Sequence, residues 1–303
     1  MDLSSSKEPK RIKTIEVKDK FQTPSKKHLD KTLIKATSCG DVKTVETLLK
    51  LGANVNTQNR KKQTPLHLAS YRAEHAIAKI LLENGANVYA QDSNGRTPLH
   101  EACFIEANLE MVQILLKHHA NVNKRTRTGK SPLHYACVYS EGPAIVEILL
   151  ENGASLNAPD ERGWTPLHMA SQGVNANNCK LELLKILLQN YADVNATDDM
   201  QQTPLHHACW AGGSVEKVQA LLQCNADVLK NIDSRDFDGY TPLQFAIERG
   251  HSEVVKLLLK NGCNTEIRGK SFWNDDWPDC TSFELALKME YFEVLKIIAF
   301  HKN

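Results

Sequence analysis

The chain has 303 residues, a formal net charge of +1 and eight cysteines. A net charge this close to zero favours neither a nucleic-acid nor a membrane partner. The sequence has no N-terminal apolar segment of the signal-peptide type and no run of 18 apolar residues, so we expect a soluble protein that the usual signal does not export. Because no Cys-x-x-Cys pair occurs and the chain is not short, we interpret the cysteines as reduced thiols in the cytosol or nucleus.

Residues 1–26 differ in composition from the rest of the chain. They are rich in Lys and Ser and poor in large apolar residues, which predicts a disordered basic tail. The string KRIK at 10–13 resembles a short nuclear-import signal, although such strings also occur by chance in solvated tails.

Two short phrases recur in fixed order along the rest of the chain. The second phrase, such as LLENGANVYA at residue 81, follows each of the first six copies of the first phrase, and LLKLGANVNT at residue 48 indicates an earlier, degraded copy. The copies of the first phrase are spaced by 33, 34, 34, 38, 38 and 40 residues, which is the signature of a repeat protein. They are TPLHLA, TPLHEA, SPLHYA, TPLHMA, TPLHHA, TPLQFA and TSFELA, beginning at Thr64, Thr97, Ser131, Thr165, Thr203, Thr241 and Thr281.

Each unit carries the signals of two helices and a turn. Thr-Pro opens the first helix, because threonine can cap exposed amides and proline fits the first turn. The second helix has helical apolar spacing and ends at a glycine such as Gly85, after which DSNGR at 92–96 predicts a hairpin-like finger. Because no unit can bury its own apolar face, stability must come from stacking. The predicted repeats are 27–58, 59–91, 92–125, 126–159, 160–197, 198–235, 236–275 and 276–303.

The two phrases together closely resemble the ankyrin repeat, and the resemblance covers residues 27–303. It implies an all-α ankyrin-repeat solenoid of about eight helix-turn-helix units with β-hairpin-like finger loops. It also implies a non-catalytic protein with no cofactor, no metal and no small-molecule substrate, whose partners are other proteins. The histidine of TPLH resembles the ankyrin histidine that forms hydrogen bonds within and between finger turns.

A His-x-x-Cys spacing raises the question of a metal or catalytic site. It occurs three times, and a spacing of three places both side chains near one helix face. However, the pairs His67/Ser70 and His168/Ser171 fill the same two slots, and serine is a poor zinc ligand. The sequence also has no P-loop, no H-E-x-x-H and no G-x-S-x-G, so we expect no enzyme.

The helix slots after each TPLHxA phrase predict a binding surface. In ankyrin proteins, partners commonly contact the finger tips and the exposed side of the first helices. Four of six repeats place large apolar or aromatic residues in these slots, which predicts a continuous apolar stripe for a partner. The alternative is that the long inserts fold back and bury the stripe. The helix residues expected to bind are Tyr71, Arg72, Phe104, Ile105, Val138, Tyr139, Trp210 and Arg249.

The finger tips change in charge along the chain. The early fingers are basic, and the later ones become acidic and aromatic, with Asp198, Asp199, Asp236 and Asp238. Such a gradient would orient a partner of complementary charge, although charged residues also simply solvate a surface. The finger residues expected to bind are Arg60, Lys61, Arg96, Lys130, Trp164, Tyr240, Trp273 and Trp277.

Length and charge also distinguish some units from the others. Three repeats carry inserts, at 173–180, 229–235 and 268–280. Inserts often serve binding, although surface loops also accept extra residues cheaply. Lys31 and Lys35 in the first unit, and the polar residues at the end of the last, predict solvated caps.

We therefore predict a monomeric, non-catalytic protein-protein interaction scaffold or adaptor without membrane insertion. Its expected location is the cytoplasm, with the nucleus as the alternative. It would bind a partner protein through the concave helix face and the finger tips. One rival is a nuclear or nucleic-acid-associated regulatory factor that uses the basic tail and early fingers. The other is an ankyrin-type effector of an intracellular microbe that acts on host proteins.

Overall fold

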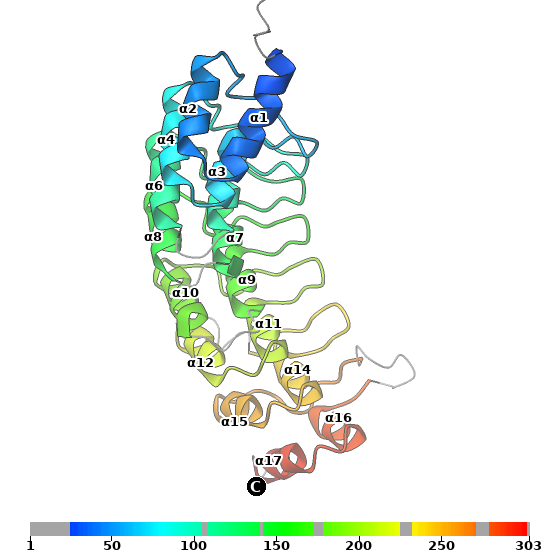
Figure 1. The fold of residues 1–303 in the computed structure, drawn as a ribbon. Helices are drawn as coiled ribbons and strands as arrows, with labels where there is room; N and C mark the ends of the chain where they lie inside the picture. The colour runs from blue at the N-terminus through cyan, green and yellow to red at the C-terminus, as the bar shows by residue number, and fades with distance from the viewer. Residues whose placement is uncertain are drawn as a thin grey trace, which may run out of the picture.

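Helices alternate between two stacked layers, and the loops between units project to one side of both (Figure 1). The computed structural model describes residues 25–104, 108–139, 142–172, 178–224, 232–270 and 279–301. The first helices of the units are α1 (Lys26–Ser38), α3 (Pro65–Tyr71), α5 (Pro98–Cys103), α7 (Pro132–Tyr139), α9 (Pro166–Gln172), α11 (Pro204–Trp210), α14 (Pro242–Glu248) and α16 (Ser282–Lys288). The second helices are α2 (Val42–Lys50), α4 (His75–Glu83), α6 (Leu109–Lys117), α8 (Ala144–Glu151), α10 (Asn178–Gln189), α12 (Val215–Gln223), α15 (Ser252–Lys260) and α17 (Phe292–His301).

Each layer is continuous, because every helix contacts the corresponding helix of the next unit. The described ranges contain no β-strand, only an isolated bridge between Gly269 and Cys280. The predicted all-α solenoid with finger loops is therefore confirmed. None of the helices in the described part of the chain is both long enough and apolar enough to span a membrane.

The core lies in the joints between units. The leucine of each TPLH phrase is at most 3 % exposed from Leu66 to Leu243. Second-helix residues such as Ile77 and Val254 are fully buried against the same joints. This is the stacking that a unit without its own core requires.

A repeated hydrogen-bond pattern holds the fingers. The amide of Asp92 donates to the carbonyl of Arg96 at 2.9 Å, and its Oδ1 accepts from two amides within the same turn. Adjacent fingers are joined by backbone bonds such as that from the amide of Asp199 to the carbonyl of Arg162, at 3.0 Å. Gly163 has φ +76, and a Cβ there would lie 2.8 Å from the next finger's backbone, so this close approach requires glycine.

The insert predicted at 173–180 is in part helix. Residues 178–180 form the start of α10, which has 12 residues where α4, α6, α12 and α15 have nine. Residues 173–177, 229–231 and 271–278 of the three inserts lie outside the described residues, as do residues 1–24 of the predicted tail at 1–26, whose last residue, Lys26, belongs to α1.

The two ends of the stack differ in character. Lys31 and Lys35 are exposed on α1, as expected for a solvated cap. In the last unit, His301 is exposed as expected, and residues 302–303 lie outside the described residues. On α16, however, Phe283 is 37 % exposed and Leu287 is 56 % exposed, so the last unit also presents apolar side chains to solvent. Both residues stand in slots that face the next unit in interior repeats.

This difference predicts unequal effects of two matched substitutions. Ile247 occupies the same slot as Leu287 but is fully buried. Ile247→Ala should lower the free energy of unfolding by about 2–4 kcal/mol, because it opens a cavity in a joint. Leu287→Ala should cost less than about 1 kcal/mol, because its side chain is already solvated. Urea unfolding, followed by circular dichroism, measures both free energies. Equal losses would contradict the conclusion that the core lies between neighbouring units.

Candidate protein-binding surface

The TPLH histidines fix each finger against the next. His67 accepts the Thr64 amide at Nδ1, at 3.1 Å, and its Nε2 lies 3.0 Å from the Arg96 carbonyl of the following finger. The predicted hydrogen bonds within and between fingers are therefore confirmed. The same pair of contacts, with Nε2 3.0–3.2 Å from the carbonyl, occurs at His67, His100, His134, His168 and His206.

The cysteines of the His-x-x-Cys spacings are core residues. Cys103, Cys137 and Cys209 are fully buried, and burial raises the pKa of each thiol, to about 12 for Cys137. Ser70 and Ser171 are equally buried in the same slot. Among the described residues, no three His, Cys, Asp or Glu side chains gather as metal ligands would.

Four aromatic side chains form what we call the aromatic row: Tyr71 on α3, Phe104 directly after α5, and Tyr135 and Tyr139 on α7. The Phe104 ring centre lies 6.0 Å from that of Tyr71 and 4.1 Å from that of Tyr139. Tyr71 and Tyr139 remain 43 % and 41 % exposed. Val138 and Arg72, also predicted to bind, are exposed beside them. The first half of the predicted stripe is therefore a connected and accessible surface.

The stripe does not continue unbroken to Trp210, as we expected from the sequence. Gln172 stands in the corresponding slot of the intervening repeat and is partly buried. Trp210 itself is partly buried, with the Arg249 guanidinium 4.7 Å from its ring centre and the Phe245 ring 5.6 Å away. The described surface consequently has two patches, the aromatic row and the surroundings of Trp210.

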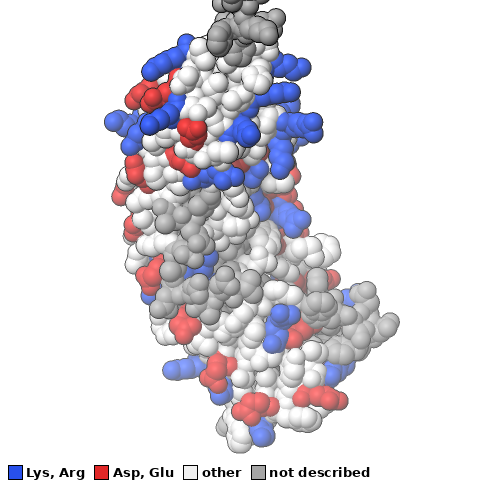
Figure 2. Space-filling model, in the orientation of Figure 1, with Lys and Arg blue, Asp and Glu red and all other residues white. Residues whose placement is uncertain are grey.

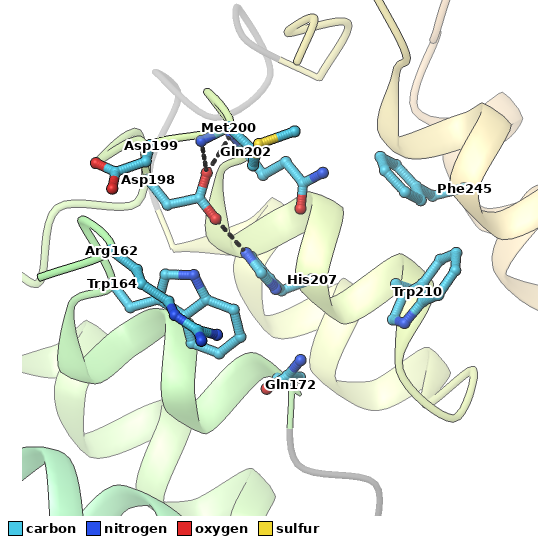
Figure 3. A pocket seen from close by; sticks show the side chains of 10 residues that line it. All are labelled: Arg162, Trp164, Gln172, Asp198, Asp199, Met200, Gln202, His207, Trp210 and Phe245. Atoms are coloured by element: carbon cyan, nitrogen blue, oxygen red, sulfur yellow. Dashed lines mark hydrogen bonds and ion pairs between the residues drawn. The ribbon is translucent and has the colours of Figure 1, made fainter. Parts of the chain in front are cut away.

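The second patch contains a cavity of about 420 Å³, which we call the Trp164–Trp210 pocket. Figure 3 shows His207 between Trp164 on one side and Trp210 and Phe245 on the other. The Trp164 and His207 rings meet edge to face, with 4.5 Å between their centres. The lining residues are Arg162, Trp164, Gln172, Asp198, Asp199, Met200, Gln202, His207, Trp210 and Phe245.

Asp198 joins this pocket to the finger above it. Its Oδ1 accepts the amides of Met200 and Gln202, and its Oδ2 accepts from His207 Nε2 at 2.9 Å. Burial alone would raise the pKa of this carboxyl, but the hydrogen bonds from His207 and from the Gln202 amide outweigh burial and lower it. The aspartate therefore orients the imidazole as well as the finger turn.

The charge gradient along the fingers is only partly as predicted. Arg60 and Lys61 are exposed, and Figure 2 shows Lys and Arg gathered at the N-terminal end of the solenoid. Asp198 and Asp236 are only 6 % exposed, so counting them as acidic tips was wrong. Both carboxylates accept hydrogen bonds from backbone amides of their own finger turns.

Two further basic finger residues differ in availability. The Arg96 guanidinium lies 3.0 Å from Asp92 Oδ2 and 3.3 Å from Glu101 Oε1, so internal ion pairs already engage it. Lys130 is partly exposed and lines two smaller cavities together with Arg162 and Trp164. Of these two, only Lys130 remains open to a partner's carboxylate.

Tyr240 was predicted to bind a partner, and that prediction is wrong. It is 1 % exposed, its ring meets Phe245 edge to face at 5.3 Å, and its hydroxyl donates to Glu248 Oε1 at 3.3 Å. A tyrosine at the end of a finger can reach back into the first helix of its own unit. Ile105, Trp273 and Trp277, also predicted, lie outside the described residues.

The sequence reasoning missed one helix slot that lines the surface. This slot follows the histidine of each TPLH phrase and supplies Tyr135 to the aromatic row and His207 and Phe245 to the pocket. A usable signal was present, because the slot differs among the six copies from Thr64 to Thr241 while its neighbours stay nearly constant. Its occupants are Leu68, Glu101, Tyr135, Met169, His207 and Phe245.

Comparison with known proteins agrees with this geometry. The sequence matches the family model of ankyrin repeats in overlapping segments that run from residue 33 to residue 303. The chain belongs to the ankyrin repeat family. The crystal structure of the human ASB11 ankyrin repeat domain is similar, with 29 % sequence identity and a TM-score of 0.63. The similarity covers 77 % of this chain and 98 % of that chain.

Membership of the ankyrin family gives the coarse function. Ankyrin repeats generally mediate protein–protein interaction, and the family is generally non-enzymatic. Because such folds host many roles, this chain's own role must be argued from its surface.

Proposed function

We propose that this protein is a non-catalytic scaffold or adaptor that binds a partner protein through the concave helix face and the finger tips. The aromatic row carries the proposal. Phe104 contacts both Tyr71 and Tyr139 across three units; the two tyrosines remain 43 % and 41 % exposed, and Phe104 is partly exposed. Connected exposed aromatic surface of this kind is typical of partner sites, and Tyr often dominates binding energy.

Charge supports a direction for the partner. The exposed Arg60 and Lys61 lie on the finger side at the N-terminal end of the row, and Lys130 lies beside Tyr135 and Tyr139. An acidic stretch in the partner would therefore meet the early fingers. We also propose a monomer in the cytoplasm, with the nucleus as the alternative.

Affinity capture tests this function. The full chain should retain partners that the variant Phe104→Ala/Tyr139→Ala/Trp210→Ala loses, with at least a tenfold fall in recovery, because hot-spot aromatics contribute 2 kcal/mol or more each. The matched control is Tyr89→Ala/Tyr191→Ala/Phe300→Ala, three aromatics that are 56 %, 90 % and 79 % exposed elsewhere on the surface. If every captured protein survives the first variant, the proposed surface is wrong.

A nucleic-acid role is the second candidate, because Arg60, Lys61 and Lys62 are exposed in one finger. Binding to phosphates weakens steeply with salt. A protein partner on the aromatic surface should instead bind with only a weak dependence on salt, and Trp210→Ala should weaken its binding far more than Lys61→Ala does. Salt-sensitive binding lost on Lys61→Ala would favour the nucleic-acid role. A microbial effector would use the same surface and differ only in where its partner comes from.

A further inference from the structure

We propose that the Trp164–Trp210 pocket receives one side chain of the partner, an aromatic ring that carries a hydrogen-bond donor, and so a tyrosine or a tryptophan. This inference rests on the proposed function and specifies the anchor that the partner supplies. It follows from the size of the pocket, its walls and one polar atom on its floor.

The pocket has the size and the walls for one ring. Its volume of about 420 Å³ lies at the small end of the range for ligand sites. Trp164 stands on one side, and Trp210 and Phe245 stand on the other, so an inserted ring would contact aromatic surface on both sides (Figure 3). Aromatic pairs in such offset or edge-on contact are favourable beyond the area that they bury.

His207 gives the pocket a polar requirement. It is 5 % exposed, and its Nε2 donates to Asp198 Oδ2 at 2.9 Å. In the tautomer that carries its proton on Nε2, the imidazole has a lone pair on Nδ1 that can accept a hydrogen bond. Among the described residues, the His207 side chain has one hydrogen bond, at Nε2, and none at Nδ1. A ring without a donor would bury this atom unsatisfied, whereas a phenol O–H or an indole N–H would satisfy it.

The charges at the rim argue against a cationic anchor. Aromatic walls can also accept an ammonium or a guanidinium. Here, however, the Arg249 guanidinium already lies over Trp210, and Arg162 is exposed at the opposite wall. Asp199 is the one exposed carboxylate among the residues that line the described pocket, since Asp198 is buried and paired. A neutral ring avoids the repulsion that a second cation would meet.

The Asp198–His207 pair also resembles half of a catalytic constellation, which would need a nucleophile beside it. No serine, threonine, cysteine or lysine is present among the residues lining the described pocket. The geometry therefore favours recognition by the imidazole over catalysis.

Side-chain analogues test the proposal without knowledge of the partner. The probes are 4-methylphenol, 3-methylindole and toluene, titrated into the full chain while the indole N–H signals of Trp164 and Trp210 are followed by NMR. The two probes with a donor should shift these signals and bind about tenfold more tightly than toluene, because only they satisfy Nδ1. Equal affinities for 4-methylphenol and toluene, or no shift at either tryptophan, would overturn the proposal.

Two variants separate the acceptor from the walls. His207→Phe keeps an aromatic ring, which repeat seven already has in this slot as Phe245, and should abolish the preference for donors. Trp210→Ala should weaken all three probes. Tyr191→Ala, at a residue 90 % exposed outside the pocket, should change none, and circular dichroism confirms that each variant folds. A preference that persists in His207→Phe also overturns the proposal.

The outcome can be distinguished from failure of the proposed function. If the probes fail but partner capture still depends on Phe104 and Tyr139, the anchor pocket is wrong and the binding surface stands. If capture is also insensitive to the aromatic row, both are wrong.

Discussion

At pH 5, the variant His100→Gln/His168→Gln/His206→Gln is expected to remain folded where the unmodified chain has lost most of its stability. Burial, which disfavours the charged imidazolium, lowers the pKa of each of these histidines to about 4. It also lowers the pKa of His67 and His134. The hydrogen bonds of these histidines to backbone carbonyls raise the pKa, but by less than burial lowers it.

The sign of the effect follows from linkage. An unfolded histidine binds its proton near pH 6.5, whereas these folded ones stay neutral until about pH 4. Their contribution is therefore fully present above pH 6.5 and is lost as the pH falls toward 4, because protons then bind preferentially to the unfolded chain. At pH 5, each of these histidines lowers the free energy of unfolding by about 2 kcal/mol relative to neutral pH. The three together remove about as much free energy as stabilises a typical domain.

Glutamine is the appropriate replacement because the chain already uses it. Gln244 occupies the histidine slot of repeat seven, where its Oε1 accepts the Thr241 amide at 2.9 Å and its Nε2 donates to the Cys280 carbonyl at 2.8 Å. The variant should therefore keep both contacts of each histidine while removing the titrating group. Circular dichroism between pH 8 and pH 4 measures the midpoint of acid unfolding.

The matched control is His28→Gln/His118→Gln/His301→Gln, which changes three exposed histidines. Its acid midpoint should equal that of the unmodified chain. The same midpoint in the buried-histidine variant would mean that carboxylates, not the finger histidines, control acid unfolding.

The elements of this fold were predictable because local contacts make them. Thr64 and Thr97 precede α3 and α5, and each pairs with the histidine three residues later in a capping box. Those contacts lie within four residues, so a sequence phrase encodes them directly. The finger turn is local in the same way, with Asp92 bonding amides two and four residues ahead.

The binding surface was less predictable because side-chain fate depends on neighbouring units. Trp164 and Tyr240 end their fingers in equivalent positions, yet Trp164 lines a pocket and Tyr240 is buried. The difference lies eight residues downstream of Tyr240, where Glu248 accepts its hydroxyl. Likewise, the pocket requires Asp198 to orient His207, and repeat periodicity does not specify that contact.

Lys217 shows most clearly where periodicity fails. It occupies an apolar core slot of the second helix, which Ile77, Met111, Leu183 and Val254 fill in other repeats. It is nevertheless 3 % exposed, with Nζ donating to the Ala170 carbonyl near the end of α9 at 3.2 Å. Burial, followed by the nearby Lys180, lowers its pKa to about 8.

Replacing Lys217 by methionine, the residue that the third repeat carries in this slot as Met111, should stabilise the protein. Keeping the ammonium charged at pH 7 costs about 3 kcal/mol, given a pKa near 8 in the folded chain against about 10.4 when unfolded. Losing the bond to the Ala170 carbonyl costs about 1 kcal/mol. The first term is larger than the cost of losing a hydrogen bond, so Lys217→Met should raise the free energy of unfolding by up to about 2 kcal/mol at pH 7, measured by urea unfolding.

The pH dependence identifies the cause. Because the folded pKa of Lys217 is depressed, the unfolded chain binds more protons between pH 8 and pH 10, and the unmodified protein should gain stability across that range. Lys217→Met should lack this gain. Lys180→Met is the contrasting control, since Lys180 is a partly buried residue of α10 whose Nζ donates to the carbonyls of Cys137 and Val138 in α7. Its loss should destabilise by about 1 kcal/mol. If Lys217→Met instead destabilises to the same degree, the buried ammonium is held by bonds that outweigh its desolvation, and the slot has been adapted to a charge.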